Sequence, residues 1–303
     1  MICSVCIATY KRPELLDRLL TSLEEQVLPD NVELEIIVVD NDCVRSAAPV
    51  IARHDDRKPL SCHYFIQPQK NISMARNMAV ANARGAYLLF IDDDERATSS
   101  WAAALLETAG RYRADVVFGP VFPAFDNEAP EWIRKRGWLL VGDTIPKAPT
   151  GSEALGTWAG NCLVKASILK GITGPFDPEY GDTGGEDTEL FNRLKRRGAR
   201  LIYCNEACVF EHWPLSRTRL SYLLRRGLTG GNIHTRRAIA FARRKGSVRM
   251  VMLVKAVAFG FLSLALAIVT LPSRLWRTYW QMKLAANVGR FMAAVGQHYR
   301  SYS

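Results

Sequence analysis

Short apolar runs alternate with amphipathic stretches over residues 1–95. The runs typical of strands are CSVCIA (3–8), LEIIVVD (34–40), HYFIQ (63–67) and AYLLFI (86–91). The stretches with helical spacing of apolar residues are PELLDRLLTSLEEQ (13–26), which opens on Pro13, and SMARNMAVANA (73–83). This βαβ alternation predicts an α/β domain, and the near-continuous apolar strands predict a mostly parallel, doubly wound sheet buried on both faces.

The pattern is less regular over residues 96–211. It predicts a helix at 101–113, strands at DVVFGPVF (115–122) and NCLVK (161–165), and a helix after the GGED sequence at 184–187. No internal repeat and no low-complexity tract occurs in the sequence. Residues 212–303 differ in composition throughout, so we treat them as a third segment.

Polar residues follow three of the predicted strands. They are Thr9, Tyr10 and Lys11 after the first strand, Asp40, Asn41 and Asp42 after the second, and Asp92 to Glu95 after the fourth. The carboxyl ends of parallel strands lie at one edge of a sheet, where ligands bind in folds of this kind. We therefore expect these side chains to converge on one crevice.

The charge of the chain is very unevenly distributed. No Asp or Glu follows Glu211, and the 16 Lys and Arg residues of 212–303 give that segment a charge of +16. Residues 1–211 hold the other 24 basic residues and all 30 acidic ones, which gives −6 and the total of +10. A compact DNA-binding domain usually carries its positive stripe through the folded domain. This distribution of charge therefore argues against nucleic acid as a partner.

The seven Cys residues have no regular spacing. Cys3 and Cys6 have CxxC spacing inside a predicted strand, where residues three apart face opposite ways, so a shared metal or redox pair is not expected. We interpret them as buried thiols of a reducing compartment. The N-terminus has no basic region followed by an apolar stretch and a cleavage site, so we expect a protein that is not exported.

Asp92, Asp93, Asp94 and Glu95 form an acidic turn directly after a strand. Four adjacent acids repel one another unless a cation or strong donors lie between them. Mg²⁺ and Mn²⁺ bind one or two carboxylates together with substrate phosphates, which a nucleoside diphosphate site requires. A solvated acidic turn is the alternative.

Five motifs, ATYKRP, VVDND, NISMARN, FIDDDE and GGEDTEL, occur in this order. Together they resemble the signature set of family 2 glycosyltransferases with a GT-A fold, over residues 1–231. NISMARN, DDDE and GGEDTEL are especially similar to succinoglycan-type glucosyltransferases of bacterial exopolysaccharide assembly, which act on a lipid-linked oligosaccharide. The resemblance implies a nucleotide-sugar-binding half at 1–95, a metal- and acceptor-binding half at 96–231 and a helical, membrane-associating segment at 232–303.

The resemblance also implies a set of donor-site residues. Thr9 and Asp40 would contact the nucleoside, Arg76 would lie near the nucleotide, and Asp92 would lie near the ribose. The remaining candidates for the donor site are Tyr10, Arg12, Asn71, Asp93, Glu186, Arg225 and Arg226. The two C-terminal arginines would clamp the diphosphate, with surface solvation as the alternative.

Metal and acid–base roles follow from the same resemblance. Asp94 would hold Mn²⁺ or Mg²⁺, and His212 would be a further ligand of the metal or diphosphate, with a structural histidine as the alternative. The metal would act as a Lewis acid on the leaving diphosphate. Asp187 would be the general base that deprotonates the acceptor hydroxyl, so that an in-line displacement inverts the anomeric configuration. Helix capping is the alternative role for Glu186 and Asp187.

The run VMLVKAVAFGFLSLALAIVTL at 251–271 is 21 residues long and carries one charge, Lys255. It is long enough to cross a bilayer. Arginines and lysines flank it on both sides, and positive residues favour the cytoplasmic side, so we expect a re-entrant or in-plane anchor on the cytoplasmic face of a bacterial inner membrane. Trp276, Tyr279 and Trp280 would lie at headgroup level. The alternative is a helical hairpin buried in the soluble core.

The leading functional hypothesis is metal-dependent transfer of a hexose, with glucose from UDP-glucose as the expected donor, to a polyprenyl-diphosphate-linked saccharide. A sugar-nucleotide pyrophosphorylase would have a Gly-rich loop after the first strand, and ATYKRP has no Gly. A hydrolase with paired carboxylates leaves the nucleotide-site motifs unexplained. A membrane-associated saccharide-binding or scaffolding protein that has lost catalysis is the non-enzymatic alternative.

Overall fold

The computed structural model describes residues 1–55, 61–141, 148–155, 157–169, 171–181, 184–240, 242–297 and 299. The chain forms two compact units. The first comprises Met1–Ala124, Gly142–Gly181 and Glu186–His212, and the second comprises Phe125–Val141, Asp182–Gly185 and Trp213–Ser303. The predicted three-part division by function stays a prediction.

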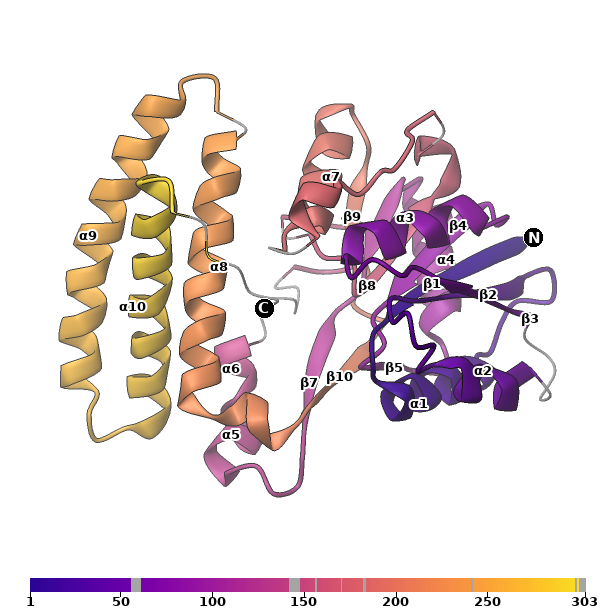
Figure 1. The fold of residues 1–303 in the computed structure, drawn as a ribbon, viewed down its shortest axis with the longest axis horizontal. Helices are drawn as coiled ribbons and strands as arrows, with labels where there is room; N and C mark the ends of the chain where they lie inside the picture. The colour runs from indigo at the N-terminus through magenta and orange to yellow at the C-terminus, as the bar shows by residue number, and fades with distance from the viewer. Residues whose placement is uncertain are drawn as a thin grey trace. The chain divides into compact units, whose positions relative to one another are not determined.

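The first unit is built on a seven-stranded sheet with the order β3-β2-β1-β4-β8-β6-β9 (Figure 1). Its strands are β1 (Ile2–Thr9), β2 (Glu33–Asp40), β3 (Ser61–Ile66), β4 (Tyr87–Ile91), β6 (Val116–Phe118), β8 (Asn161–Lys165) and β9 (Leu201–Tyr203). Only β8 runs antiparallel to both of its neighbours, and the other pairs are parallel. The predicted α/β class with a mostly parallel sheet is confirmed.

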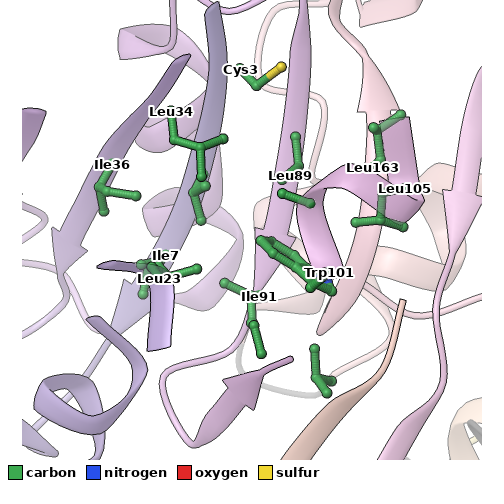
Figure 2. Close-up of a cluster of buried hydrophobic side chains, with 14 of the residues drawn as sticks. Cys3, Ile7, Leu23, Leu34, Ile36, Leu89, Ile91, Trp101, Leu105 and Leu163 are labelled. Carbon is green, nitrogen blue, oxygen red and sulfur yellow. The ribbon is translucent and has the colours of Figure 1, made fainter. Parts of the chain in front are cut away.

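Helices cover both faces of this sheet. They are α1 (Pro13–Glu24), α2 (Ala48–Asp55), α3 (Ile72–Asn82), α4 (Trp101–Tyr112) and α7 (Glu186–Arg196), with short turns of 3₁₀ helix at η1 (Ala166–Leu169) and η2 (Pro178–Tyr180). Residues of α1, α2 and α4 pack on one face, where Figure 2 shows Leu23 of α1 with Trp101 and Leu105 of α4. Residues of α3 and α7 pack on the other face. Cys3 lies in the first cluster and Cys6 in the second, which confirms that the CxxC pair faces opposite ways.

A second, three-stranded sheet has the order β5-β10-β7 and consists of β5 (Glu95–Ala97), β10 (Val209–Trp213) and β7 (Val121–Phe125). The prediction of one strand over 115–122 is therefore wrong, because that run contributes β6 to one sheet and β7 to the other. The break lies at Gly119 and Pro120. A Cβ at Gly119 would lie 2.2 Å from the Ala207 carbonyl oxygen, and Pro120 has no backbone N–H for a ladder.

The second unit is helical. It contains α5 (Glu131–Arg136), α6 (Trp138–Val141), η3 (Leu215–Thr218), α8 (Leu220–Ala240), α9 (Lys245–Val269) and α10 (Arg274–Ala294). In Figure 1, α8, α9 and α10 lie side by side, and α10 packs on both of the others. The contact between α8 and α10 is backbone against backbone, since a Cβ at Gly231 would lie 1.9 Å from the Ala286 carbonyl oxygen. Larger side chains are excluded there.

Among the residues that the structure describes, α9 is the one helix long and apolar enough to cross a bilayer. Only 22% of its most apolar 18-residue window is buried. Phe261 is 71% exposed and Val254 is 60% exposed. The α9 helix is therefore not a buried core helix of the described structure, in contrast to the hairpin alternative.

Candidate active site

The carboxyl ends of β1, β2 and β4 converge as the strand pattern predicts. Thr9 and Asp40 are register partners at the ends of β1 and β2. The Thr9 hydroxyl donates a hydrogen bond of 2.8 Å to Asp93 in the turn after β4. Thr9 is buried, so it anchors the acidic turn to β1. The polar residues of the three strands thus share one edge of the sheet.

Arg12 supplies positive charge to this turn. The backbone reaches it through Lys11, which has a φ of 55°, and α1 begins directly afterwards at Pro13. Its Nη1 atom lies 3.0 Å from Asp93 Oδ1 and 3.1 Å from Asp94 Oδ2. Burial raises the pKa of Asp93 to about 6, although Arg12 acts in the opposite direction.

Arg76 links the acidic turn to the first turn of α7. It lies on α3 and is buried, with Nη2 2.9 Å from Asp92 Oδ1 and Nη1 bonded to Glu186 Oε1. Burial raises the pKa of Glu186 to about 7, with a further contribution from the charge of Asp187 and an opposing one from Arg76. Arg76 is therefore the cation that lets two carboxyl groups stay this close.

This arrangement predicts a pH-dependent stability. The pKa of Glu186 is about 7 in the folded chain against an ordinary value of 4.5, so the folded state holds a proton that the unfolded state has released between these pH values. Stability should therefore fall as the pH rises from 4.5 to 7. Glu186→Gln keeps an oxygen for Arg76 and removes the titrating group. In urea unfolding, the variant should therefore gain about 3 kcal/mol over wild type between pH 4.5 and pH 8, because wild type loses this stability and the variant does not.

Glu189→Gln is the matched control for that measurement, because Glu189 is in the same turn and pairs with Arg193 outside the buried network. The prediction would be wrong if the unfolding free energy of wild type stayed level between pH 4.5 and 8 and the Glu186→Gln variant showed the same pH profile as wild type.

Glu95 has a role that the sequence analysis did not separate from the other acids. It is buried, and its Oε2 atom accepts a hydrogen bond of 3.0 Å from the backbone N–H of Asp92. Burial and the nearby Asp92 raise the pKa of Glu95 well above its ordinary value. Gly160 lies against both acids, because a Cβ there would be 2.7 Å from Glu95 Oε1 and 2.9 Å from Asp92 Oδ2. Glu95 therefore holds the backbone of the turn, and Gly160 leaves the space that the side chains of Asp92 and Glu95 occupy.

Asp187 is the half-buried acid of the α7 N-terminus. Its Oδ2 atom accepts a hydrogen bond of 3.2 Å from the backbone N–H of Ala159, and its Oδ1 atom accepts from Thr188. Its charge acts on both Arg76 and Asp92, so it lies within electrostatic range of the acidic turn. The carboxylate is thus held in place and still partly accessible.

The loop that holds Asp187 presents an aromatic side chain that the sequence analysis did not select. Trp158 directly precedes Ala159, and its indole N–H donates to the Gly119 carbonyl oxygen at 3.1 Å. Its ring stacks on Tyr203 with a centroid separation of 6.0 Å and is partly exposed. Trp158 is therefore a packed, partly exposed aromatic residue next in sequence to the one that holds Asp187. An aromatic ring can pack against the carbon face of a sugar ring.

The structure brings His212 to the acidic turn through β10. The His212 backbone N–H donates to the Asp94 carbonyl oxygen at 2.7 Å. Both residues line a cavity of about 150 Å³ together with Glu95, Arg96 and Arg18. Asp94 and His212 therefore line the same cavity although they are far apart in the sequence.

Asp40 and Asn71 lie inside the loops around the crevice. Asp40 is fully buried, and its Oδ2 atom accepts from the backbone N–H of Ala47 at 2.9 Å and from the hydroxyl of Tyr64 at 2.8 Å. Asn71 caps α3 by accepting from Met74 N at 3.0 Å. Both residues hold loop geometry here, and their predicted contacts with the nucleotide stay predictions.

Two further polar groups lie near these loops. Asp42 is buried, and its Oδ2 atom has no hydrogen-bond partner among the described residues. Tyr10 lies between two ammonium groups, with Nζ of Lys11 and Nζ of Lys70 each 5.2 Å from its ring centroid. A buried acceptor without a partner is costly unless a ligand donates to it, so Asp42 adds to the predicted nucleoside contacts.

Arg225 and Arg226 lie on α8 in the second unit. The Arg226 guanidinium carbon is 5.4 Å from the ring centroid of Trp213. This cation–π contact gives Arg226 a structural partner within its own unit. The predicted clamp on the diphosphate stays a prediction.

The family model described as glycosyl transferase family 2 matches residues 4–173. The chain belongs to this family. The succinoglycan biosynthesis protein ExoM of Rhizobium meliloti (strain 1021) is 31% identical over 290 residues, covering 96% of this chain and 92% of the relative. The resemblance drawn from the five motifs is thereby confirmed.

Two other comparisons give a further relative and a solved structure. The GalNAc(5)-diNAcBac-PP-undecaprenol beta-1,3-glucosyltransferase of Campylobacter jejuni is 30% identical over 118 residues, covering 37% of this chain and 36% of the relative. The crystal structure of S. aureus TarS 1-349 in complex with UDP matches with a TM-score of 0.56 at 17% identity, covering 99% of this chain and 93% of that one. The TarS likeness shows the GT-A fold of this chain.

Proposed function

We propose that this glycosyltransferase is inverting and moves glucose from UDP-glucose to a saccharide carried on a polyprenyl diphosphate. The observation that carries the proposal is the position of Asp187. A half-buried carboxylate is held by the Ala159 N–H beside the acidic turn and within the same compact unit. Family relatives in exopolysaccharide and glycan biosynthesis support the reaction class.

In the proposed reaction, Asp187 accepts the proton of an acceptor hydroxyl as that oxygen attacks C1 of the donor sugar. The new bond joins C1 to the acceptor oxygen, and the bond from C1 to the diphosphate oxygen breaks on the opposite face. One displacement inverts the anomeric configuration. Trp158 would orient the acceptor ring against the base, since it directly precedes the residue that holds Asp187.

The residues of the acidic turn fit a divalent cation whose coordination is completed by substrate. Asp94 offers a carboxylate, a ligand type that suits Mg²⁺ and Mn²⁺, and His212 lines the same cavity. The cation would share Asp94 with Arg12, whose Nη1 atom lies 3.1 Å from Asp94 Oδ2. No group of three or more His, Cys, Asp or Glu side chains within the described ranges is arranged to hold an ion by itself. Two protein ligands plus phosphates is the usual arrangement for Mg²⁺ at nucleotide sites. When bound, the cation would stabilise the charge of the diphosphate.

A nucleotide screen tests the donor assignment. A ligand that binds only the folded state stabilises the protein by about 2.7 kcal/mol when its concentration is a hundred times Kd. The melting temperature of the protein rises as a result. UDP-glucose with Mn²⁺ should raise the Tm more than GDP- or dTDP-sugars, and Asp42→Ala should weaken this shift. A larger shift with a GDP- or dTDP-sugar would contradict the donor assignment.

We also propose that the second unit holds the enzyme on the cytoplasmic face of the membrane. The exposed apolar residues of α9 and the exposed Trp276 support this attachment, and each basic residue near an anionic surface adds about 1 kcal/mol. Membrane fractions should keep the protein through a high-salt wash and release it to detergent, because salt screens charge but not apolar burial. A reporter fused after the C-terminus should be cytoplasmic. Release by salt alone, or a periplasmic reporter, would contradict this attachment.

A further inference from the structure

An apolar groove runs between α9 and α10 on the second unit. Its volume is about 360 Å³, and its walls include Val257, Phe261 and Leu264 of α9 and Leu284, Val288 and Phe291 of α10. Val257, Phe261, Leu264, Val288 and Phe291 are between 44% and 71% exposed. An apolar surface of this kind is costly in water and fits a hydrocarbon ligand.

Basic groups from three helices gather near one another in the same unit. They are His234 and Arg237 of α8, Lys255 of α9 and Arg290 of α10. Burial lowers the pKa of His234, and the charges of Arg290, Arg237 and Lys255 lower it further. No acidic residue follows Glu211 in the sequence, so the segment that carries this cluster brings no carboxylate of its own.

The groove and the basic cluster are in contact at Arg290. Asn287 lines the groove, and its Oδ1 atom accepts a hydrogen bond of 3.0 Å from Arg290 Nη1. The Arg290 Nε atom is buried and has no hydrogen-bond partner among the described residues. The charges of Lys255 and Arg290 both act on His234, so Lys255 lies in the same region of the second unit as Arg290. The Arg290 guanidinium therefore lies next to the apolar groove, where it can bind an anionic group of a ligand.

We propose that this groove binds the hydrocarbon chain of a prenyl phosphate, with its phosphate at Lys255 and Arg290. A groove between two helices takes one chain, and a prenyl phosphate has one chain whereas a bilayer phospholipid has two. The assignment rests on the proposed function, because the lipid-linked acceptor would be carried on a prenyl chain, and the phosphate attached to that chain is the group that the probe reproduces. It adds a carrier site on the second unit, separate from the residues of the acidic turn.

Photolabelling tests this site on the full chain in phosphatidylcholine vesicles. A farnesyl phosphate with a photoactivatable group near the chain end should label α9 and α10 saturably, as read by peptide mass spectrometry. Unlabelled farnesyl phosphate should compete, whereas farnesol and inorganic phosphate should compete at least about tenfold more weakly. Equal competition by farnesol, or by phosphatidylglycerol, would overturn the proposal. The groove would then not be selective for a prenyl phosphate over a prenyl alcohol or an anionic phospholipid.

Gly260→Leu and Leu262→Phe are a matched pair of variants. A Cβ at Gly260 has its nearest neighbour at 3.9 Å, so the longer side chain enters the groove without a backbone clash. It should lower labelling by about tenfold, the effect of losing roughly two buried methylene groups. Leu262→Phe adds bulk to α9 outside the groove residues and should leave labelling unchanged. Equal labelling of both variants would overturn the proposal.

Lys255→Gln tests the phosphate end. It should weaken farnesyl phosphate labelling and leave weak farnesol labelling unchanged, since only the anion loses its partner. Loss of both would overturn the assignment of the head group. Donor hydrolysis and transfer to a soluble saccharide should be intact in all three variants, because Gly260, Leu262 and Lys255 are not among the residues predicted to bind the donor, the metal or the acceptor sugar. Absent transfer with intact, saturable labelling would refute the proposed reaction while leaving the groove assignment standing.

Discussion

Asp187→Asn is expected to lower the rate of sugar transfer by about 10²- to 10⁴-fold, the usual contribution of a general base. The amide cannot accept the acceptor proton. Its oxygen can still accept the hydrogen bond from Ala159 N–H, so the loop should keep its conformation. Donor affinity, measured from nucleotide-dependent thermal stabilisation, should be nearly unchanged because the base contacts the acceptor hydroxyl and not the nucleotide.

Glu189→Gln is the control for the loss of one negative charge at the α7 N-terminus. Glu189 pairs with Arg193 one turn along the helix, and its replacement should leave transfer unchanged. A parallel collapse of donor affinity and turnover in Asp187→Asn would make Asp187 a ligand or a helix cap instead. Transfer close to the wild-type rate would exclude it as the base.

Asp94→Asn is expected to lower transfer by about 10²-fold or more, since loss of several kcal/mol of charge stabilisation costs at least two orders of magnitude. The change leaves Arg12 bonded to Asp93, so the turn should keep its anchor. The affinity for Mn²⁺ in the presence of UDP should fall in parallel, which calorimetry can measure without turnover. Chelator should lower wild-type activity to the level of the variant.

Asp17→Asn removes a carboxylate of α1 that pairs with Arg53 and His54 away from the acidic turn, and it should leave transfer unchanged. Full wild-type activity in excess chelator would rule out the metal requirement. In that case Arg12, which already lies 3.1 Å from Asp94, would be the cation at this position.

Several features of the site follow from local sequence. The apolar strands predict a parallel sheet, and the shared edge of its carboxyl ends explains why Thr9 hydrogen-bonds to Asp93, 84 positions later. The two glycines and the acids of GGED predict the start of α7, because acids are stabilised at a helix N-terminus. The spacing of apolar residues and the polar residues that follow a strand are properties of short segments. The sequence by itself therefore determined the helices and strands and the edge of the sheet where the acids lie.

Other features depend on contacts between distant segments, and only the tertiary structure decided them. Arg76 bridges the half-exposed Asp92 and the buried Glu186, which makes a predicted nucleotide ligand the cation between two carboxyl groups. Close packing at Gly119 divided one apolar run between two sheets. The apolar run at 251–271 has the same composition whether it is buried or exposed, and burial depends on which neighbours cover it. The spacing of apolar residues indicates whether a segment prefers helix or strand. The charge pairing and exposure of a residue depend instead on the groups that the fold brings beside it.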